Sequence, residues 1–110
     1  MRTPILLRSL VLTVFASLFA GSVAAGDPAR GEAKSAVCAA CHGPTGTSPV
    51  PDFPNIGGQY EQYLYRAMLD YRLGNRQDPI MQAQVAELSR QDMRDLAAFY
   101  ARQEGLYLKR

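Results

Sequence analysis

Two cysteines and a histidine stand together in the stretch Cys38-Ala39-Ala40-Cys41-His42. Two thiols three positions apart, followed at once by an imidazole, form the pattern that attaches haem through two thioether bonds. The two intervening residues let a helical turn span the distance between the porphyrin vinyl groups, and the adjacent imidazole can then ligate the iron. The chain has two cysteines and one histidine in all, so this motif uses every one of them. We therefore predict one covalent haem c on Cys38 and Cys41, with His42 as an axial ligand.

Three other chemistries compete with haem attachment at this motif. A redox-active dithiol usually opens a helix within a βαβ pattern, and no alternating strand pattern surrounds Cys38 and Cys41. A structural zinc site needs four ligands, usually Cys or His, and the chain has only two cysteines and one histidine. A disulfide across so short a spacing is strained. Haem attachment is therefore the favoured interpretation.

Residues 1–25 have the composition of an export signal. Arg2 and Arg8 give a positive start, a largely apolar stretch follows, and small residues precede the end. The apolar run is short for a membrane span of about 20 residues, although a retained anchor is the alternative. We predict cleavage after Ala25, or after the alanine before it, which leaves residues 26–110 as the mature domain. Since haem is attached to such cysteines outside the cytoplasm, in an oxidising compartment, leader and motif agree on a periplasmic protein.

The charges of the expected mature domain balance. The whole chain has 12 Lys and Arg against 10 Asp and Glu. The charged residues of the leader are Arg2 and Arg8. Residues 26–110 therefore carry ten of each sign, whereas nucleic-acid binding needs a strong basic excess. A domain of this size has a thin core, so a large apolar cofactor would supply much of its buried surface. No set of residues indicates acid, base or nucleophile chemistry, so we do not expect an enzyme.

Start and stop patterns predict an all-helical domain. Asp27-Pro28 is typical of a helix start and predicts a helix over residues 28–38, with Gly31 inside it. Residues 42–58 hold four prolines and four glycines, which predicts a long loop. Three further helices are predicted at residues 59–73, at residues 80–88, and from the capping residue Ser89 to a stop at Gly105, with a turn at 75–79.

The helix predicted over residues 59–73 carries a stripe of apolar side chains at helical spacing. Its members are Tyr60, Tyr63, Leu64, Ala67, Met68 and Tyr71. Such a stripe either fills an ordinary core or contacts a cofactor, and the two interpretations are compatible. Tyr63 is therefore a candidate for the surroundings of the haem.

The second axial position of the iron needs a ligand other than histidine, because His42 is the single histidine. Methionine is the next candidate, and its thioether raises the reduction potential. Past the leader the chain offers Met68, Met81 and Met93. Met68 lies on the apolar stripe, where methionine usually fills core, and Met93 lies early in the last helix, whereas Met81 follows a proline in a segment able to present it from a loop. We predict Met81 as the second ligand; the alternative is that it only packs and the iron stays open.

These residues resemble the class I c-type cytochromes of the small bacterial monohaem kind, and are similar to one haem domain of the periplasmic dihaem cytochromes. The resemblance covers residues 27–103. Its haem motif is highly specific, and its other matches are individually weak but occur in the same order as in the family. These matches are Gly31, Gly43, Pro54-Asn55-Ile56-Gly57-Gly58-Gln59, Tyr63-Leu64, Gly74-Asn75-Arg76, Pro79-Ile80-Met81 and Leu96-Ala97-Ala98-Phe99-Tyr100.

The resemblance implies a small all-α domain of the class I cytochrome c kind, wrapped around one covalent haem. It implies Met81 as the distal ligand and a hydrogen bond from His42 Nδ1 to the Pro54 carbonyl. It also implies that Gly31 lets the first helix cross the last one closely, against Tyr100. The implied function is soluble electron carriage between transient redox partners, without a membrane span after cleavage.

Two alternatives to a free carrier stay open at this point. One is a cytochrome subunit or docking module of a larger oxidoreductase. The other is a five-coordinate haem protein that binds small ligands. Any role that needs two haems in one chain is not expected, because the sequence carries a single haem motif where the dihaem cytochromes have two haem domains.

Overall fold

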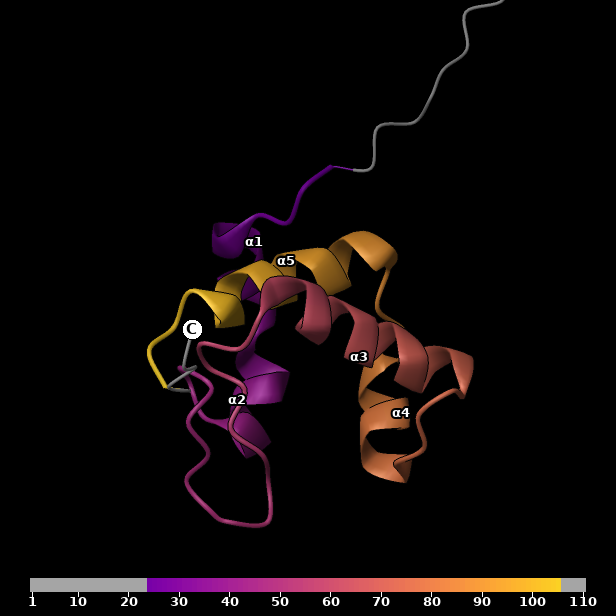
Figure 1. The fold of residues 1–110 in the computed structure, drawn as a ribbon, viewed down its shortest axis with the longest axis horizontal. Coiled ribbons are helices and arrows are strands. Elements are labelled where there is room, and N and C mark those ends of the chain that lie inside the picture. The colour runs from indigo at the N-terminus through magenta and orange to yellow at the C-terminus, as the bar shows by residue number, and fades with distance from the viewer. Residues whose placement is uncertain (1–23, 106–110) are drawn as a thin grey trace, which may run out of the picture.

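The computed structural model describes residues 24–105, so nearly all of the predicted leader, residues 1–25, lies outside the described part. The described part contains α1 (Pro28–Lys34), α2 (Ala36–His42), α3 (Glu61–Leu73), α4 (Pro79–Val85) and α5 (Arg90–Ala101). It contains no strand, which confirms the all-helical prediction. None of these helices is long and apolar enough to cross a membrane. In Figure 1, α3 and α5 cross one end of the domain, with α2 and α4 below them on opposite sides.

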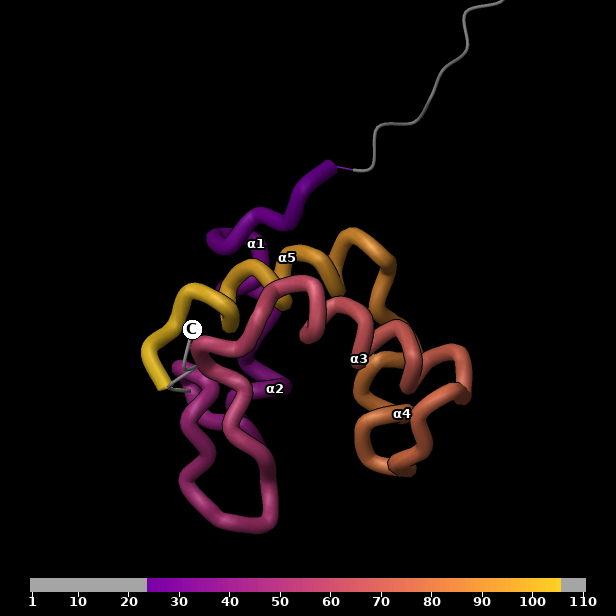
Figure 2. Tube along the Cα trace, viewed as in Figure 1, coloured from indigo at the N-terminus to yellow at the C-terminus, as the bar shows by residue number. Residues whose placement is uncertain are grey.

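Helix α5 is the centre of the packing. All residues from Asp95 to Tyr100 are buried, as is Met93, because α1 packs on one side of the helix and α3 on another. Figure 2 traces these crossings along the chain. A helix that is buried nearly all round needs apolar partners on several sides. Two core clusters contain these contacts. In one, Leu64 of α3 packs with Leu96, Ala97, Phe99 and Tyr100 of α5, and in the other, Leu69 of α3 and Val85 of α4 pack with Met93 of α5.

Local capping starts and ends the helices at several of the predicted points. The Asp27 carboxylate accepts hydrogen bonds from two backbone N–H groups of the first turn of α1, at 2.8 and 3.2 Å. Ser89 and Asp92 form a capping box, in which each side chain accepts from the other residue's N–H, at 3.0 and 2.9 Å. Gly74 ends α3 in the left-handed conformation, with a φ of 80°. These ends depend on neighbouring residues alone.

The single helix predicted over residues 28–38 is wrong, because the chain bends at Ser35 and continues as α2 to His42. The Ser35 hydroxyl and the Ser35 N–H both donate to the Glu32 carbonyl oxygen, at 2.8 and 3.1 Å. A serine hydroxyl that bonds to the preceding turn competes with the helical ladder and bends the axis. The bend lets α1 pack on α5 while α2 runs toward the long loop. The last helix ends at Ala101, before the glycine that was predicted to stop it.

Gly31 lies where α1 crosses α5. A Cβ atom at this position would come within 2.0 Å of the Asp95 carbonyl oxygen and 2.8 Å of Phe99 Cβ, so only glycine fits the crossing. The implied close approach is therefore present. The atoms nearest to that Cβ belong to Asp95 and Phe99, and Tyr100, the partner that the resemblance implies, follows Phe99 on α5 and also lines a cavity.

A buried carboxylate also joins α1 to α5. The Asp95 side chain is fully buried and accepts hydrogen bonds from Arg30 Nε at 3.1 Å and Lys34 Nζ at 3.0 Å. The Asp27 N–H and Gln91 Nε2 each donate a further bond at 2.9 Å. Burial alone would raise the pKa of Asp95, but these hydrogen bonds outweigh burial, so the pKa lies well below its usual range. The ionised carboxylate therefore stabilises the α1–α5 crossing.

Asp95→Asn is expected to lower the free energy of unfolding by about 2–3 kcal/mol at neutral pH, since hydrogen bonds to charged groups contribute roughly that much. A depressed native pKa adds stability above the unfolded pKa of about 3.9 and loses it as pH falls toward the native pKa. The difference between wild type and variant should therefore shrink below about pH 4, as measured by urea unfolding across pH.

The matched control for this prediction is Asp70→Asn. Asp70 Oδ1 pairs with Arg66 Nε at 2.9 Å, but the Arg66 side chain is 66% exposed. Exposed ion pairs of this kind contribute about 0–1 kcal/mol. If the two variants lose the same free energy of unfolding, the buried hydrogen bonds of Asp95 contribute no more to stability than an exposed ion pair does.

Candidate haem site

The haem motif lies on α2, where helical geometry gathers its reactive atoms. Cys38, Cys41 and His42 occupy positions i, i+3 and i+4 and so share one face. The two cysteines are partly buried and form no disulfide, and burial raises the pKa of the Cys38 thiol, the reverse of a redox-active dithiol. No group of three or more His, Cys, Asp or Glu within residues 24–105 could hold a metal ion, so the zinc alternative finds no further ligands there. The structure thus favours haem attachment.

His42 is buried and oriented by one hydrogen bond. Its Nδ1 lies 2.8 Å from the Pro54 carbonyl oxygen, which is the contact that the family resemblance implies. A carbonyl only accepts, so Nδ1 carries the proton and donates, which leaves the Nε2 lone pair available for a metal. Pro54 belongs to the predicted long loop, whose turn is closed by the Gly46 carbonyl accepting from Ile56 and Gly57 at 2.8 and 3.0 Å. The loop therefore orients the imidazole.

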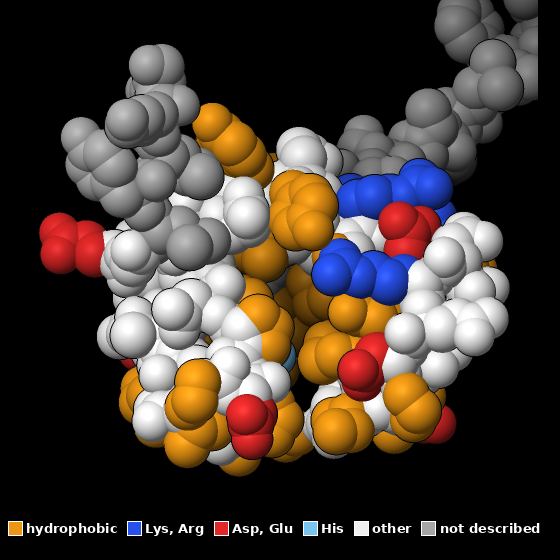
Figure 3. Space-filling model, turned by 60° about the horizontal axis from the view of Figure 1, so that its bottom comes forward, with side chains coloured by type: hydrophobic (Ala, Val, Ile, Leu, Met, Phe, Trp, Pro, Cys, Tyr) orange, Lys and Arg blue, Asp and Glu red, His pale blue; other side chains and the backbone are white. Residues whose placement is uncertain are grey.

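A cleft opens between α2 with its loop and the α3–α4 pair. It consists of two adjoining cavities of about 230 and 180 Å³. Figure 3 shows hydrophobic side chains around the hollow, with the histidine visible inside it. The residues shared by the two cavities are Cys38, His42, Pro54, Tyr71 and Met81. The predicted attachment and axial residues therefore meet at one place, with the exception of Cys41, which lines the smaller cavity alone.

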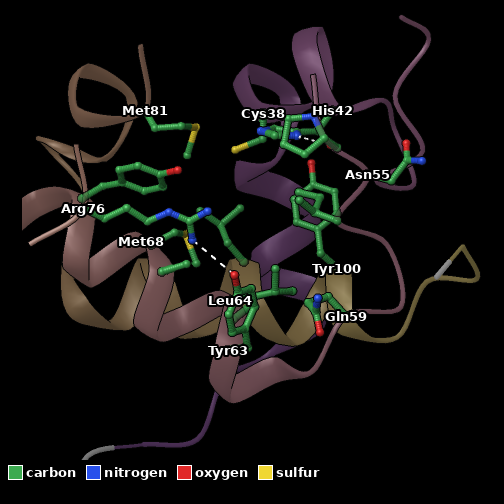
Figure 4. A pocket seen from close by; sticks show the side chains of 16 residues that line it. Cys38, His42, Asn55, Gln59, Tyr63, Leu64, Met68, Arg76, Met81 and Tyr100 are labelled. Carbon is green, nitrogen blue, oxygen red and sulfur yellow. Dashed lines mark hydrogen bonds between the residues drawn. The ribbon is translucent and has the colours of Figure 1, made fainter. Parts of the chain in front are cut away.

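Two of the three candidate methionines reach this cleft. Met81 lines both cavities, and in Figure 4 its sulfur points across the cleft toward the side where His42 lies. Met68 lines the larger cavity from α3, whereas Met93 of α5 is fully buried in the core cluster with Leu69 and Val85. The expectation that a loop presents Met81 is wrong, because Met81 lies in the first turn of α4, where its N–H donates to the Asp78 cap at 2.9 Å.

The apolar stripe of α3 lines the cleft and also joins the core, since Leu64 belongs to a buried cluster and Met68 packs against it. Tyr63 is 51% exposed, which is high for an aromatic side chain in a core and fits one at the mouth of a cleft. Tyr60 is wrongly included in the stripe, since it is exposed and lines neither cavity. The pattern also missed Leu69, which is buried against α4 and α5. The stripe residues that line the larger cavity are Tyr63, Leu64, Ala67, Met68 and Tyr71.

Tyr100 brings into the cleft a polar atom that sequence reasoning did not place there. Its ring packs edge-on against Phe99, and its buried hydroxyl has no hydrogen-bond partner. The Ser35 hydroxyl lies near enough to lower the pKa of Tyr100, while its own hydrogen is donated to the Glu32 carbonyl. Burial, assisted by the nearby Cys38, raises the pKa of Tyr100 to about 12, so the hydroxyl stays protonated. Because this hydroxyl stays protonated at the wall of the cleft, it can donate a hydrogen bond to a polar group of a bound cofactor.

These features fit a haem. The cleft is mostly apolar, two thiols stand at one edge, an imidazole and a thioether face each other across it, and Tyr100 leaves a buried donor unsatisfied. A haem held there supplies an iron that changes its oxidation state by one electron. Fold and site together define a small helical protein with covalently attached haem.

Comparison with known proteins agrees with this class. The family model for Cytochrome c matches residues 28–101. Cytochrome c4 of Pseudomonas aeruginosa is 48% identical over 99 residues, covering 90% of this chain and 48% of that protein. Cytochrome c-554(548) of Halomonas halodenitrificans is 41% identical over 83 residues, covering 73% of this chain and 100% of that protein. The crystal structure of reduced recombinant cytochrome c4 from Pseudomonas stutzeri matches with a TM-score of 0.71 at 40% identity, over 74% of this chain and 48% of that one.

This chain belongs to the cytochrome c family. The predicted class I fold and the covalent haem c are thereby confirmed. The chain spans about half the length of the cytochrome c4 relatives that it matches.

Proposed function

We propose that this chain is a soluble periplasmic cytochrome that carries single electrons between partner proteins through one haem. The observation that carries the proposal is the position of His42 and Met81 on opposite walls of one cleft. If the chain supplies both axial ligands, the same two ligands hold the iron in both oxidation states and little must rearrange. No coordination position is then left for a substrate, so we propose a carrier and not an enzyme.

Each residue of the motif has a distinct role in this proposal. Cys38 and Cys41, which share one face of α2, would hold the haem by thioether bonds. His42 ligates through Nε2, and the Pro54 carbonyl holds Nδ1–H, which strengthens the imidazole as a donor. Met81 supplies the second ligand, and its thioether raises the potential. Tyr63 lines the larger cavity at its mouth, where it would contact a bound haem.

The cysteine edge of the cleft is the side that partners would meet. Val37 and Ile80 line the smaller cavity beside Cys41, and these two side chains are 64% and 55% exposed. The carboxylates that line the same cavity are Asp52 and Asp78, and no lysine or arginine lines it. A transient redox partner that presents an apolar patch with basic residues at its rim would complement this edge.

The predicted export signal supports the periplasmic part of the proposal. Cleavage after Ala25 would release residues 26–110 into the compartment where haem is attached to such motifs. Intact-mass spectrometry of the periplasmic protein should give the mass of residues 26–110 plus one haem.

A redox titration followed by visible spectroscopy tests the carrier function. We expect one reversible one-electron transition, and no binding of carbon monoxide by the native reduced protein. Carbon monoxide binding without denaturation would overturn the proposal in favour of a five-coordinate, ligand-binding protein. If the protein is isolated in a stable complex with a flavin or molybdenum enzyme, it is a subunit of an oxidoreductase and not a free carrier.

A further inference from the structure

The chain enters α1 from a short segment that lies against α5. A Cβ atom on Gly26 would overlap the Arg94 carbonyl group and lie 2.9 Å from Ala98 Cβ, so only glycine fits at this point. One residue earlier, the Ala25 carbonyl oxygen accepts a hydrogen bond from Gln91 Nε2 at 3.3 Å. Figure 1 shows this segment, in indigo, passing α5 before α1 begins. The start of the expected mature domain is therefore held on α5.

The residue that follows Gly26 belongs to an ion-pair network between α1 and α5. Arg30 Nη1 lies 3.4 Å from Asp27 Oδ2, and Arg30 Nε lies 3.1 Å from Asp95 Oδ2. Lys34 Nζ lies 2.6 Å from Asp92 Oδ1 and 3.0 Å from Asp95 Oδ2, and its hydrogen bond lowers the pKa of Asp92. These pairs join three carboxylates to two cations, so the network has one negative charge in excess.

Helix α5 carries two arginines next to the residues that hold this segment. Arg94 turns its guanidinium to Tyr65 of α3, where Nη2 donates to the hydroxyl at 3.2 Å and the guanidinium lies 4.4 Å from the ring centroid. Arg90 precedes Arg94 by about one turn and is exposed, so solvent screens its charge. Neither arginine therefore neutralises the negative excess of the α1–α5 network.

Cleavage of the predicted leader changes the charge beside this network. Hydrolysis of the Ala25–Gly26 peptide bond by a leader peptidase consumes one water, leaves a carboxylate on the released leader and creates an ammonium group on Gly26. The Asp27 nitrogen lies 2.9 Å from Asp95 Oδ1. Neighbouring backbone nitrogens are at most about 3.7 Å apart, so the new charge lies within about 7 Å of that buried carboxylate. This distance is below the Debye length of about 8 Å at physiological salt, so the attraction is only partly screened.

We propose that the α-ammonium group of the mature chain, created on Gly26 by leader cleavage, joins the α1–α5 network as its third cation and stabilises the crossing of the two helices. The inference rests on the export and cleavage of the proposed function, but not on the axial ligands or the redox partners. A chain that keeps its leader lacks this charge, so its α1–α5 crossing is weaker than that of the mature protein.

Intact mass and an NMR titration of the exported, reduced holoprotein test this assignment. The mass should show that the chain starts at Gly26. The pKa of the Gly26 ammonium, followed through its α-proton shifts, should exceed the value of about 7.7–8.0 of an unpaired amino terminus. A raised native pKa gives stability that is present below about pH 7.7 and is lost as pH rises through the native pKa. Each unit of pKa rise corresponds to about a tenfold larger folding equilibrium constant, which urea unfolding measures.

A holoprotein with one extra alanine before Gly26 is the matched control, with its start checked by mass. Its ammonium group lies one residue farther from the network, at a position that is exposed in the structure. We expect an ammonium pKa of about 7.7–8.0 and a smaller folding equilibrium constant at neutral pH. Equal pKa values and equal unfolding midpoints for the two chains would overturn the assignment. A native protein that starts at any residue other than Gly26 would also overturn it, but would leave electron carriage untouched.

Asp27→Asn tests whether the ammonium group senses the network. Asparagine caps a helix about as well as aspartate, so this variant keeps the start of α1 and removes one carboxylate. The pKa of the Gly26 ammonium should fall below that of the wild type, whereas Asp70→Asn, on α3, should leave it unchanged. Equal pKa values in the two variants would refute the contact. A protein that shows the Asp27 effect but exchanges no electrons with any partner would refute the carrier function and leave this contact standing.

Discussion

A chain in which both Cys38 and Cys41 are replaced by alanine is expected to lack covalent haem and to lose its cooperative unfolding transition. Without the cofactor, water enters a cleft made of cavities of about 230 and 180 Å³, whose walls include the core residues Leu64 and Leu96. Buried apolar surface contributes about 25 cal/mol per Å². A small domain has a net stability of only about 5–15 kcal/mol, so exposing these walls removes a large share of it.

Mass spectrometry and urea unfolding followed by circular dichroism measure these two effects. The matched control is Ala40→Ser, which changes an exposed residue between the cysteines that lines neither cavity. This control should carry haem and unfold like the wild type. A cooperative transition in the double variant, close to that of the wild type, would show that the polypeptide folds without its cofactor.

Met81→Ala is expected to change the spectrum far more than the stability. If the Met81 sulfur is the second axial ligand, the variant should lose the weak near-infrared sulfur-to-iron charge-transfer band of the ferric protein. Its potential should fall, because thioether ligation favours the ferrous state, and its reduced iron should bind carbon monoxide. Absorption spectra of the ferric protein, a redox titration and a carbon monoxide difference spectrum measure the three effects.

The other two methionines provide the controls for this prediction. Met68 lines the larger cavity from α3, and Met93 is fully buried in the core between α5, α3 and α4. Met68→Leu and Met93→Leu conserve volume and should each cost less than about 1.5 kcal/mol while keeping the band. Loss of the band in Met68→Leu and its retention in Met81→Ala would move the ligand to Met68, the other sulfur that reaches the cleft.

The sequence alone determined those features that depend on residues close together in the chain, namely the haem motif and the helix ends. The motif from Cys38 to His42 specifies haem attachment because the spacing of its atoms is set within one helical turn. The caps at Asp27 and Ser89 and the stop at Gly74 follow in the same way, since each involves a side chain or backbone conformation and its immediate neighbours. The all-helical class could be predicted from such local patterns.

Only the tertiary structure decided which surfaces those helices bury. An apolar stripe has the same periodicity whether it meets a core or a cofactor, so the half-exposed position of Tyr63 could not be predicted. The bend at Ser35 depends on a hydroxyl that selects one of several hydrogen bonds open to it. Asp95 has a charged side chain, which is typical of a solvated surface, yet it is fully buried where α1 packs on α5. Arg30, which donates a hydrogen bond to Asp95, lies far away along the chain, and burial between packed helices changes the pKa of that carboxylate in a way that its neighbours in sequence do not reveal.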